Sequence, residues 1–169
     1  MTSTPPSTRI VGSLRRTEPG KGAVRMEEVY DTDLEDLWSA LTDPRRLARW
    51  LAEVEGDLHV GGRVHASFAS GWTGQGRIEV CQPPHRLMVT MSAGRPDETV
   101  IEATLADDQG RTRLVVEERG ISLDELAHHG AGWQAHVEDL AIHLRGGEAN
   151  GWHARWTALT PAYLDLPVG

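Results

Sequence analysis

The segment TDLEDLWSALTDPRRLARWL, residues 32–51, has the pattern of two short helices in succession. Thr32 and Glu35 have the spacing of a capping box, in which two side chains each accept a hydrogen bond from a backbone N–H at a helix start. Leucine and tryptophan residues then recur every three or four positions, which gives the first helix one apolar face. Asp43-Pro44 predicts where the second helix begins, because Asp caps a helix and Pro suits its first turn. The segment therefore predicts a pair of helices, each with one buried side.

Beyond this pair, from Gly62 to about Arg119, the apolar pattern changes to a period of two, which is typical of strands with one buried face. Turn residues recur at short, regular intervals and favour an antiparallel meander. Two earlier strands are expected over residues 10–16 and 23–30, and a short edge strand over residues 53–58. The sequence thus predicts an α+β fold with a curved antiparallel sheet of about six or seven strands.

One long helix is predicted late in the chain, over about residues 129–144, because apolar residues again recur at helical spacing. Gly146-Gly147 marks its end. We expect a flexible Ser/Thr/Pro-rich tail over residues 1–8, one domain over residues 9–147, and a helical extension over residues 148–169 that packs on the domain.

Composition narrows the class of protein. The net charge of −8, from 25 acidic and 17 basic residues, would repel a nucleic-acid backbone, so no nucleic-acid partner is expected. Cys81 is the single cysteine, which excludes a disulfide framework, and we predict a buried and inert thiol. No apolar run approaches the roughly 20 residues that span a bilayer. The sequence therefore predicts a cytoplasmic protein without membrane insertion, and no cofactor motif is present.

Three separated motifs resemble the START-like (SRPBCC) superfamily, and within it the family of Hsp 90 ATPase activator homologues. The first motif lies in the helical pair, over residues 37–51, and the second runs over residues 57–63. The third is Gly132-Trp133 with Val137 and Leu140 in the late helix. The resemblance implies a helix-grip fold, as in START domains and birch-pollen allergens, with a sheet curled around the C-terminal helix and an apolar cavity between them.

The resemblance leaves three functions open. Members of the superfamily bind hydrophobic small molecules, some relatives are cyclases or dehydratases, and the family is named after a co-chaperone of the stress response. We therefore consider a binding protein for a hydrophobic or amphipathic small molecule, a cyclase- or dehydratase-like enzyme, and an interaction module that docks a protein partner or a second copy of the chain. Binding is preferred, because the sequence shows no convergent acid–base set.

The polarity of the cavity separates these functions. Two or more ionisable side chains converging inside an enclosed pocket favour catalysis, and a purely apolar lining favours binding. A filled interior with a large exposed apolar patch favours docking.

Strand alternation and helical phase identify candidate cavity walls. Each of these residues also has a simpler interpretation, in which it fills a core. An error of one residue in the pairing of a strand would invert every assignment on it. The predicted ligand-binding residues are Trp50, Phe68, Ile78, Val89, Ile101, Trp133, His136, Val137 and Leu140.

Three histidines, His129, His136 and His143, follow one edge of the late helix at intervals of seven. Successive members lie about 10.5 Å apart along a helix axis, too far for two of them to hold one ion, so no metal site is predicted. His136 is interpreted as a residue of the cavity rim, with one apolar face and one wet face. A proton-transfer role for it is the alternative.

Glu117 and Glu118 are adjacent on a predicted strand, so one of them must point inward unless the strand is twisted or at an edge. An inward carboxylate could act as an acid or a base. Glu102 is expected to face solvent, since Ile101 next to it is assigned to the inside. Spacing alone names no nucleophile–base pair, and the catalytic residues are left unassigned.

Overall fold

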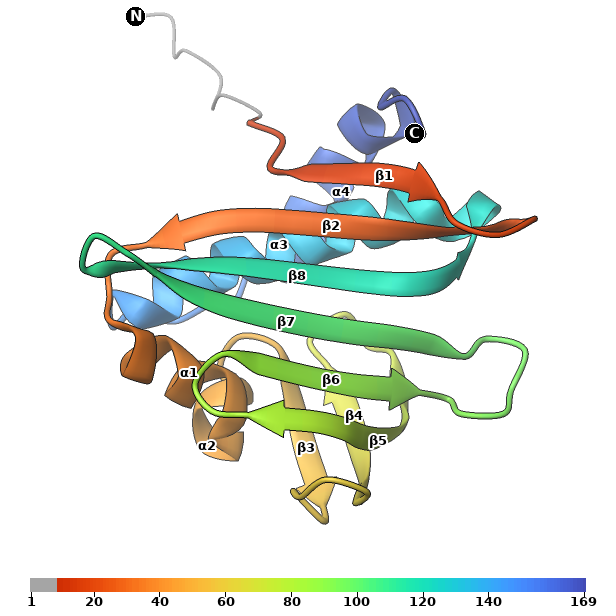
Figure 1. Cartoon of the computed structure of the whole chain (residues 1–169). Coiled ribbons are helices and arrows are strands. Elements are labelled where there is room, and N and C mark those ends of the chain that lie inside the picture. Colours follow the sequence, from red (N-terminus) through yellow and green to blue (C-terminus); the bar gives the residue numbers. More distant parts are fainter. Residues whose placement is uncertain (1–8) are drawn as a thin grey trace, which may run out of the picture.

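A computed structural model describes residues 9–169, and the tail predicted over residues 1–8 lies outside the described residues. All its strands join one antiparallel sheet, an α+β arrangement as predicted. The strands are β1 (Gly12–Arg16), β2 (Lys21–Tyr30), β3 (Ala52–Gly56), β4 (Arg63–Phe68), β5 (Thr73–Gln82), β6 (Arg86–Met91), β7 (Thr99–Asp108) and β8 (Arg111–Ser122). Their order in space is β1-β2-β8-β7-β6-β5-β4-β3 (Figure 1). The sheet thus has eight strands where about six or seven were predicted.

The helices of the described chain cover the inner side and one end of the sheet. They are α1 (Leu34–Thr42), α2 (Pro44–Leu47), α3 (Leu126–Leu144) and α4 (Trp152–Leu164), with a short 3-10 turn (Leu123–Glu125) before α3. In Figure 1, α3 passes behind β2 and β8, α4 lies alongside α3, and α1 and α2 lie at the end where β2 finishes. β3 and β4 turn behind β5 and β6, so the sheet curls toward the helices. No helix among residues 9–169 is long and apolar enough to cross a bilayer.

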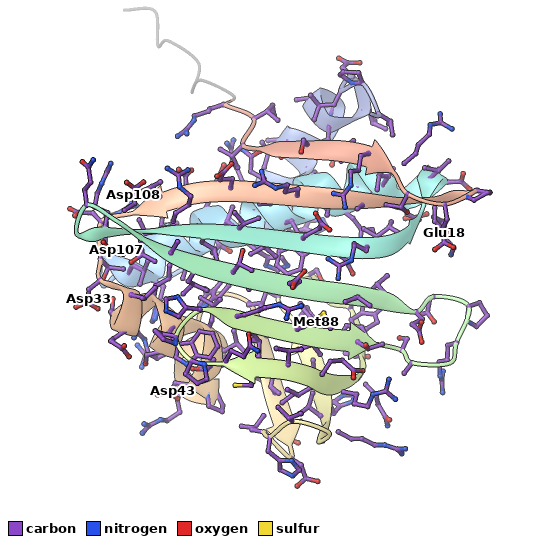
Figure 2. All side chains as sticks on the ribbon, in the orientation of Figure 1. Glu18, Asp33, Asp43, Met88, Asp107 and Asp108 are labelled. Carbon is purple, nitrogen blue, oxygen red and sulfur yellow. The ribbon has the colours of Figure 1, made fainter. Side chains whose placement is uncertain are left out.

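The two helix starts of the opening segment differ in how well they were predicted. Asp43 caps α2 as expected, with its carboxylate 3.0 Å from the N–H of the second residue after it. The capping box of Thr32 and Glu35 is wrong, because Asp33 caps α1 by accepting from the N–H of Asp36 at 2.8 Å. Thr32 instead donates its hydroxyl to the Asp36 carboxylate. Figure 2 labels Asp33 and Asp43 at these two starts.

The inner face of the sheet carries one continuous cross-strand row. Paired residues on six neighbouring strands contribute to it, and only one of them is charged. The row is Leu14, Val24, Glu118, Ile101, Val89 and Ile78. Strand alternation had assigned the last three to the inside, and they pair directly with one another.

A bulge in β5 changes which of its residues face inward. The register with β6 shifts between Ile78 and Val80, which reverses the faces of the residues that follow. Val80 pairs with Met88, which stands on the outer face that Figure 2 turns to the viewer. Cys81 pairs with Leu87 on the inner face, next to the last residue of the strand, and it is exposed there, so the prediction of a buried thiol is wrong.

Candidate functional site

A cavity lies between the concave face of the sheet and the helices, and it has two chambers. The larger has a volume of about 350 Å³ and the smaller about 180 Å³. Four side chains line both chambers, so the two adjoin. They are Phe68, Met91, Ile101 and Trp133.

The smaller chamber is enclosed by apolar side chains from α1, α2 and the sheet. Trp50, Ile78 and Val89, all predicted as walls, line it. The indole N–H of Trp50 donates to a backbone carbonyl of α1 at 2.9 Å, so its polar atom is already satisfied. Ala66 and Ala103 also line this chamber, and their short side chains leave space between the larger ones. This chamber is suited to an apolar group.

The larger chamber is walled by aromatic rings. Trp152 and Trp156 of α4 stack with their ring centres 5.9 Å apart and their planes inclined by 11°. Each donates its indole N–H to a backbone carbonyl of α3, which fixes the two rings against that helix. Trp72, in the β4–β5 turn, is 41% exposed and meets Phe68 edge-to-face at 5.6 Å. Flat rings at several angles are suited to a planar apolar guest.

A buried carboxylate stands in the wall of this larger chamber. Glu118 is 7% exposed, and its two oxygens accept three hydrogen bonds. His129 Nδ1 and Trp133 Nε1 each lie 2.9 Å from Oε1, and the hydroxyl of Thr99 lies 2.8 Å from Oε2. The cluster joins β8, β7 and α3.

The two ionisable members of the cluster shift each other's pKa. Burial by itself would raise the pKa of Glu118, but the hydrogen bond and positive charge of His129, with the other two donors, hold it below its usual value. Burial would lower the pKa of His129, but the hydrogen bond and negative charge of Glu118 raise it above its usual value. The pair is therefore held in its ionised form over a wider pH range than either group alone.

His136 is enclosed, and its predicted position at a wet rim is wrong. It is 5% exposed, and its ring lies 5.3 Å from that of Trp152 and 5.6 Å from that of Trp133. Burial lowers the pKa of His136 to about 4, against an opposing hydrogen bond with the backbone of Trp50. His136 is therefore neutral near pH 7. Its Nδ1 is buried and has no partner among residues 9–169.

Seven of the nine predicted wall residues line one chamber or both. Val137 and Leu140 line neither: they are fully packed in the core, where α3 meets α1 and the sheet. The reason is position along α3, since both lie beyond His136, the last residue of the helix that lines a chamber.

Sequence reasoning missed several lining residues. Trp152 and Trp156 lie in the predicted C-terminal extension, for which the sequence left open whether they cover this cavity or the surface of a neighbour, because their position on the cavity depends on how α4 returns along α3. Glu118 carried a usable signal, because Leu114 and Val116 share its alternation and are buried. Among residues 9–169, no group of three or more His, Cys, Asp or Glu is placed to hold a metal ion.

The linings of the two chambers differ in polarity, and each matches the lining expected for a different function. The smaller has the apolar lining expected for binding. In the larger, Glu118, His129 and His136 converge on one space, the arrangement expected for chemistry. A filled interior was the condition that favours docking, and this interior is not filled.

Comparisons with known proteins agree with this architecture. The family model of activator of Hsp90 ATPase homolog 1-like protein matches residues 31–145. No curated protein sequence matches the chain.

Solved structures are similar over most of the chain. CalU16 from Micromonospora echinospora has 27% sequence identity and a TM-score of 0.73, covering 92% of this chain and 94% of its own. Protein MLL2253 from Mesorhizobium loti has 26% identity and a TM-score of 0.64, covering 73% of this chain and 96% of its own. DynU16, a putative protein in the dynemicin biosynthetic locus, has 28% identity and a TM-score of 0.68, covering 75% of this chain but 48% of its own.

The family match extends over more than half of the sequence, and the curled sheet around α3 is the helix-grip arrangement of these similar structures. The chain therefore belongs to the family of activator of Hsp90 ATPase homolog 1-like proteins, within the START-like SRPBCC superfamily.

Proposed function

We propose that this protein binds one amphipathic small molecule in the cavity between the sheet and α3. The observation that carries the proposal is the pairing of an apolar chamber with an adjoining chamber that holds a polar cluster. An apolar part of the guest would occupy the smaller chamber, and its polar part would lie near Glu118 and His129. Burial of apolar surface drives such binding with roughly 25 cal/mol per Å².

The size of the cavity supports a guest of modest dimensions. The two chambers, about 350 and 180 Å³, are in the range of pockets that enclose small organic ligands. DynU16 is a putative protein in the dynemicin biosynthetic locus, which supports a biosynthetic product or intermediate as the class of guest.

Binding of a neutral apolar dye tests this proposal. N-phenylnaphthylamine becomes fluorescent when it leaves water, so a titration reports an accessible apolar chamber. Ala103→Phe places a ring in the smaller chamber, and the matched control Ala106→Phe places it on the exposed side of the same strand. We expect Ala103→Phe to weaken binding at least about tenfold and Ala106→Phe to leave it unchanged.

Two results would contradict the proposal. One is an absence of saturable binding by the wild-type protein. The other is equal affinity in wild type and Ala103→Phe, because the dye would then bind outside the chamber. Circular dichroism of both variants confirms that they are folded.

Docking of a protein partner or a second copy remains a prediction from the family resemblance. The large apolar residues that are well exposed within residues 9–169 fall in separate segments: the β3–β4 turn, the β4–β5 turn and the end of the chain. They are Leu58, Val60, Trp72, Leu164 and Val168.

A further inference from the structure

We propose that His129 is a general base, positioned by Glu118, which removes a proton from a guest in the larger chamber. This inference rests on the proposed function, because the guest must enter the cavity. It adds an activity to binding and assigns one role to each of the two residues.

The geometry is that of a carboxylate–imidazole pair. Glu118 accepts a hydrogen bond from Nδ1 of His129 at 2.9 Å, which leaves the lone pair of the neutral imidazole on Nε2. Nε2 forms no hydrogen bond within residues 9–169 and is not among their buried unpartnered atoms. The His129 side chain is 39% exposed and lines the larger chamber. One nitrogen therefore fixes the ring, and the other is available to a guest.

Glu118 is itself held in one orientation. Trp133 and Thr99 donate to its two oxygens, so the carboxylate cannot turn away from the imidazole without breaking a buried hydrogen bond. Because its three hydrogen-bond partners all act as donors, Glu118 serves to orient His129 and to stabilise the imidazolium that forms after proton transfer. Glu118 is a positioning residue, and His129 is the catalytic one.

The surroundings set the strength of the base. Glu118 and Glu125 both raise the pKa of His129, while burial lowers it, and the balance lies above the usual value. Lys21 and Asp97 line the same chamber with opposite charges. A general base with a pKa near the working pH is efficient, because its unprotonated form is well populated and is still basic enough to remove the proton.

The walls indicate the chemical class of substrate. Aromatic rings from β4, α3 and α4 surround the chamber, so a flat, apolar or aromatic molecule fits it. The proton removed would belong to an acidic C–H or to a hydroxyl group on that molecule. His136, neutral and enclosed by the same rings, adds no charge that would oppose the transfer.

The ring-opening elimination of 5-nitrobenzisoxazole is a suitable probe, since it needs only a general base. Nε2 of His129 takes the proton of the ring C–H beside the nitrogen. The C–H electron pair completes the nitrile bond, the N–O bond breaks, and its electrons leave on a phenolate. The imidazolium then releases the proton to water, so no oxidant, reductant or cofactor is required.

The first measurement compares wild type with three variants on this probe. We expect wild type to exceed the buffer reaction by about a hundredfold or more, and His129→Gln to lose most of that gain in kcat with a similar KM. The control His85→Gln should match wild type, because His85 also bonds through Nδ1 but lines neither chamber. Added imidazole should restore part of the rate to His129→Ala.

The second measurement tests the positioning role through the pH profile. In wild type the rate should rise with pH through the raised pKa of His129. In Glu118→Gln the midpoint should move to lower pH, because the negative charge that favours imidazolium is gone. A loss of rate in Glu118→Gln without this shift would contradict the role.

Failure of this inference and failure of ligand binding give different results. If the probe displaces N-phenylnaphthylamine but wild type reacts no faster than buffer, or His129→Gln reacts as fast as wild type, the base is absent and binding stands. If neither the probe nor the dye binds, both proposals are overturned.

Discussion

Glu117 and Glu118 are adjacent on β8, yet they lie on opposite faces of the sheet and in different electrostatic surroundings. On the outer face, Glu117 accepts two hydrogen bonds from Arg15, at 2.7 and 2.9 Å, and one from Arg119 at 2.9 Å. The hydrogen bond from Arg15 is the main reason that the pKa of Glu117 is lowered to about 2. On the inner face, Glu118 has no arginine and is paired with His129 and two neutral donors.

The outer carboxylate belongs to a ladder of ion pairs in contact with solvent. Its members come from four strands, β1, β8, β7 and β6, in the order Arg15, Glu117, Arg119, Glu102 and Arg86. The sulfur of Met88, labelled in Figure 2, lies within 4 Å of two of these arginines. Because the arginines are partly exposed, water and salt screen the ladder.

One strand thus carries a carboxylate paired with permanently charged groups on its outer face and a carboxylate paired with a titratable group on its inner face. The outer carboxylate is neutralised by guanidinium groups that stay protonated at any ordinary pH. The inner one is paired with an imidazole, whose charge changes near neutral pH. In the proposed activity it is therefore the inner pair, not the outer ladder, that would exchange a proton with a guest.

The largest expected effect comes from the aromatic wall of the inner face. Trp133→Ala removes a core side chain that also donates to Glu118, and should lower the free energy of unfolding by about 3–5 kcal/mol. Trp72→Ala, at the exposed turn, should change it by less than about 0.5 kcal/mol. Urea denaturation measures both. Similar losses for the two variants would show that Trp133 contributes no more to stability than the exposed Trp72.

The next effect separates the two glutamates directly. Glu118→Ala leaves the indole N–H of Trp133 and the hydroxyl of Thr99 without their acceptor, at a cost of about 3 kcal/mol. Glu117→Ala breaks partly exposed pairs and should cost about 1 kcal/mol or less. The same unfolding experiment compares them, and equal costs would mean that burial does not set the difference.

The pH dependence of stability also distinguishes Glu118 from Glu117. Protonated His129 stabilises the fold fully below its ordinary pKa of 6.5, and this contribution is lost as pH rises through its raised folded pKa. Ionised Glu118 contributes fully above its ordinary pKa of 4.5 and loses this as pH falls through its lowered folded pKa. The stability difference between wild type and Glu118→Gln should therefore peak between pH 4.5 and 6.5.

This difference should shrink on both sides of that window by about 1 kcal/mol, a modest value because His129 is partly exposed. Glu117→Gln is the control on the alkaline side, since the contribution of ionised Glu117 is complete above its ordinary pKa of 4.5 and declines only as pH falls toward its folded pKa of about 2. Urea midpoints across the pH series give the result, and parallel profiles for the two variants above pH 6.5 would contradict it.

The smallest effect concerns salt. Glu102→Gln removes two ion pairs of the outer ladder and should cost a few tenths of a kcal/mol at low ionic strength. That cost should vanish near 1 M NaCl, where the screening length is only about 3 Å. A cost that persists in high salt would show that the ladder is not screened as its exposure implies.

Local patterns predicted much of this molecule because local physics determines them. Alternation placed Ile78, Val89 and Ile101 on the inner face, where they form one row. Helical phase placed Trp133 at the cavity, and Asp43 capped α2 as expected. These predictions required only the periods of a strand and a helix.

Features that depend on contacts between distant segments were not predictable in this way. The bulge in β5 reverses the faces after Ile78, so that Val80 faces outward and Cys81 lines the smaller chamber, and no sequence pattern at that position predicts it. His136 is buried because Trp152, sixteen residues later, folds back over it. The pair of Glu118 and His129 forms only when α3 lies in the curl of the sheet. The fold brings these two residues together, and their order in the chain does not predict the contact.

The proposed function requires that the space between the curved sheet and α3 is a chamber that a guest can enter. Diffraction from a crystal of the protein held under xenon pressure tests it most directly, because xenon enters dry apolar cavities of this kind. We expect a xenon atom in the smaller chamber, among Ile78, Val89 and Ala103. A well-ordered interior with no xenon there, and side chains closed over the space, would contradict it.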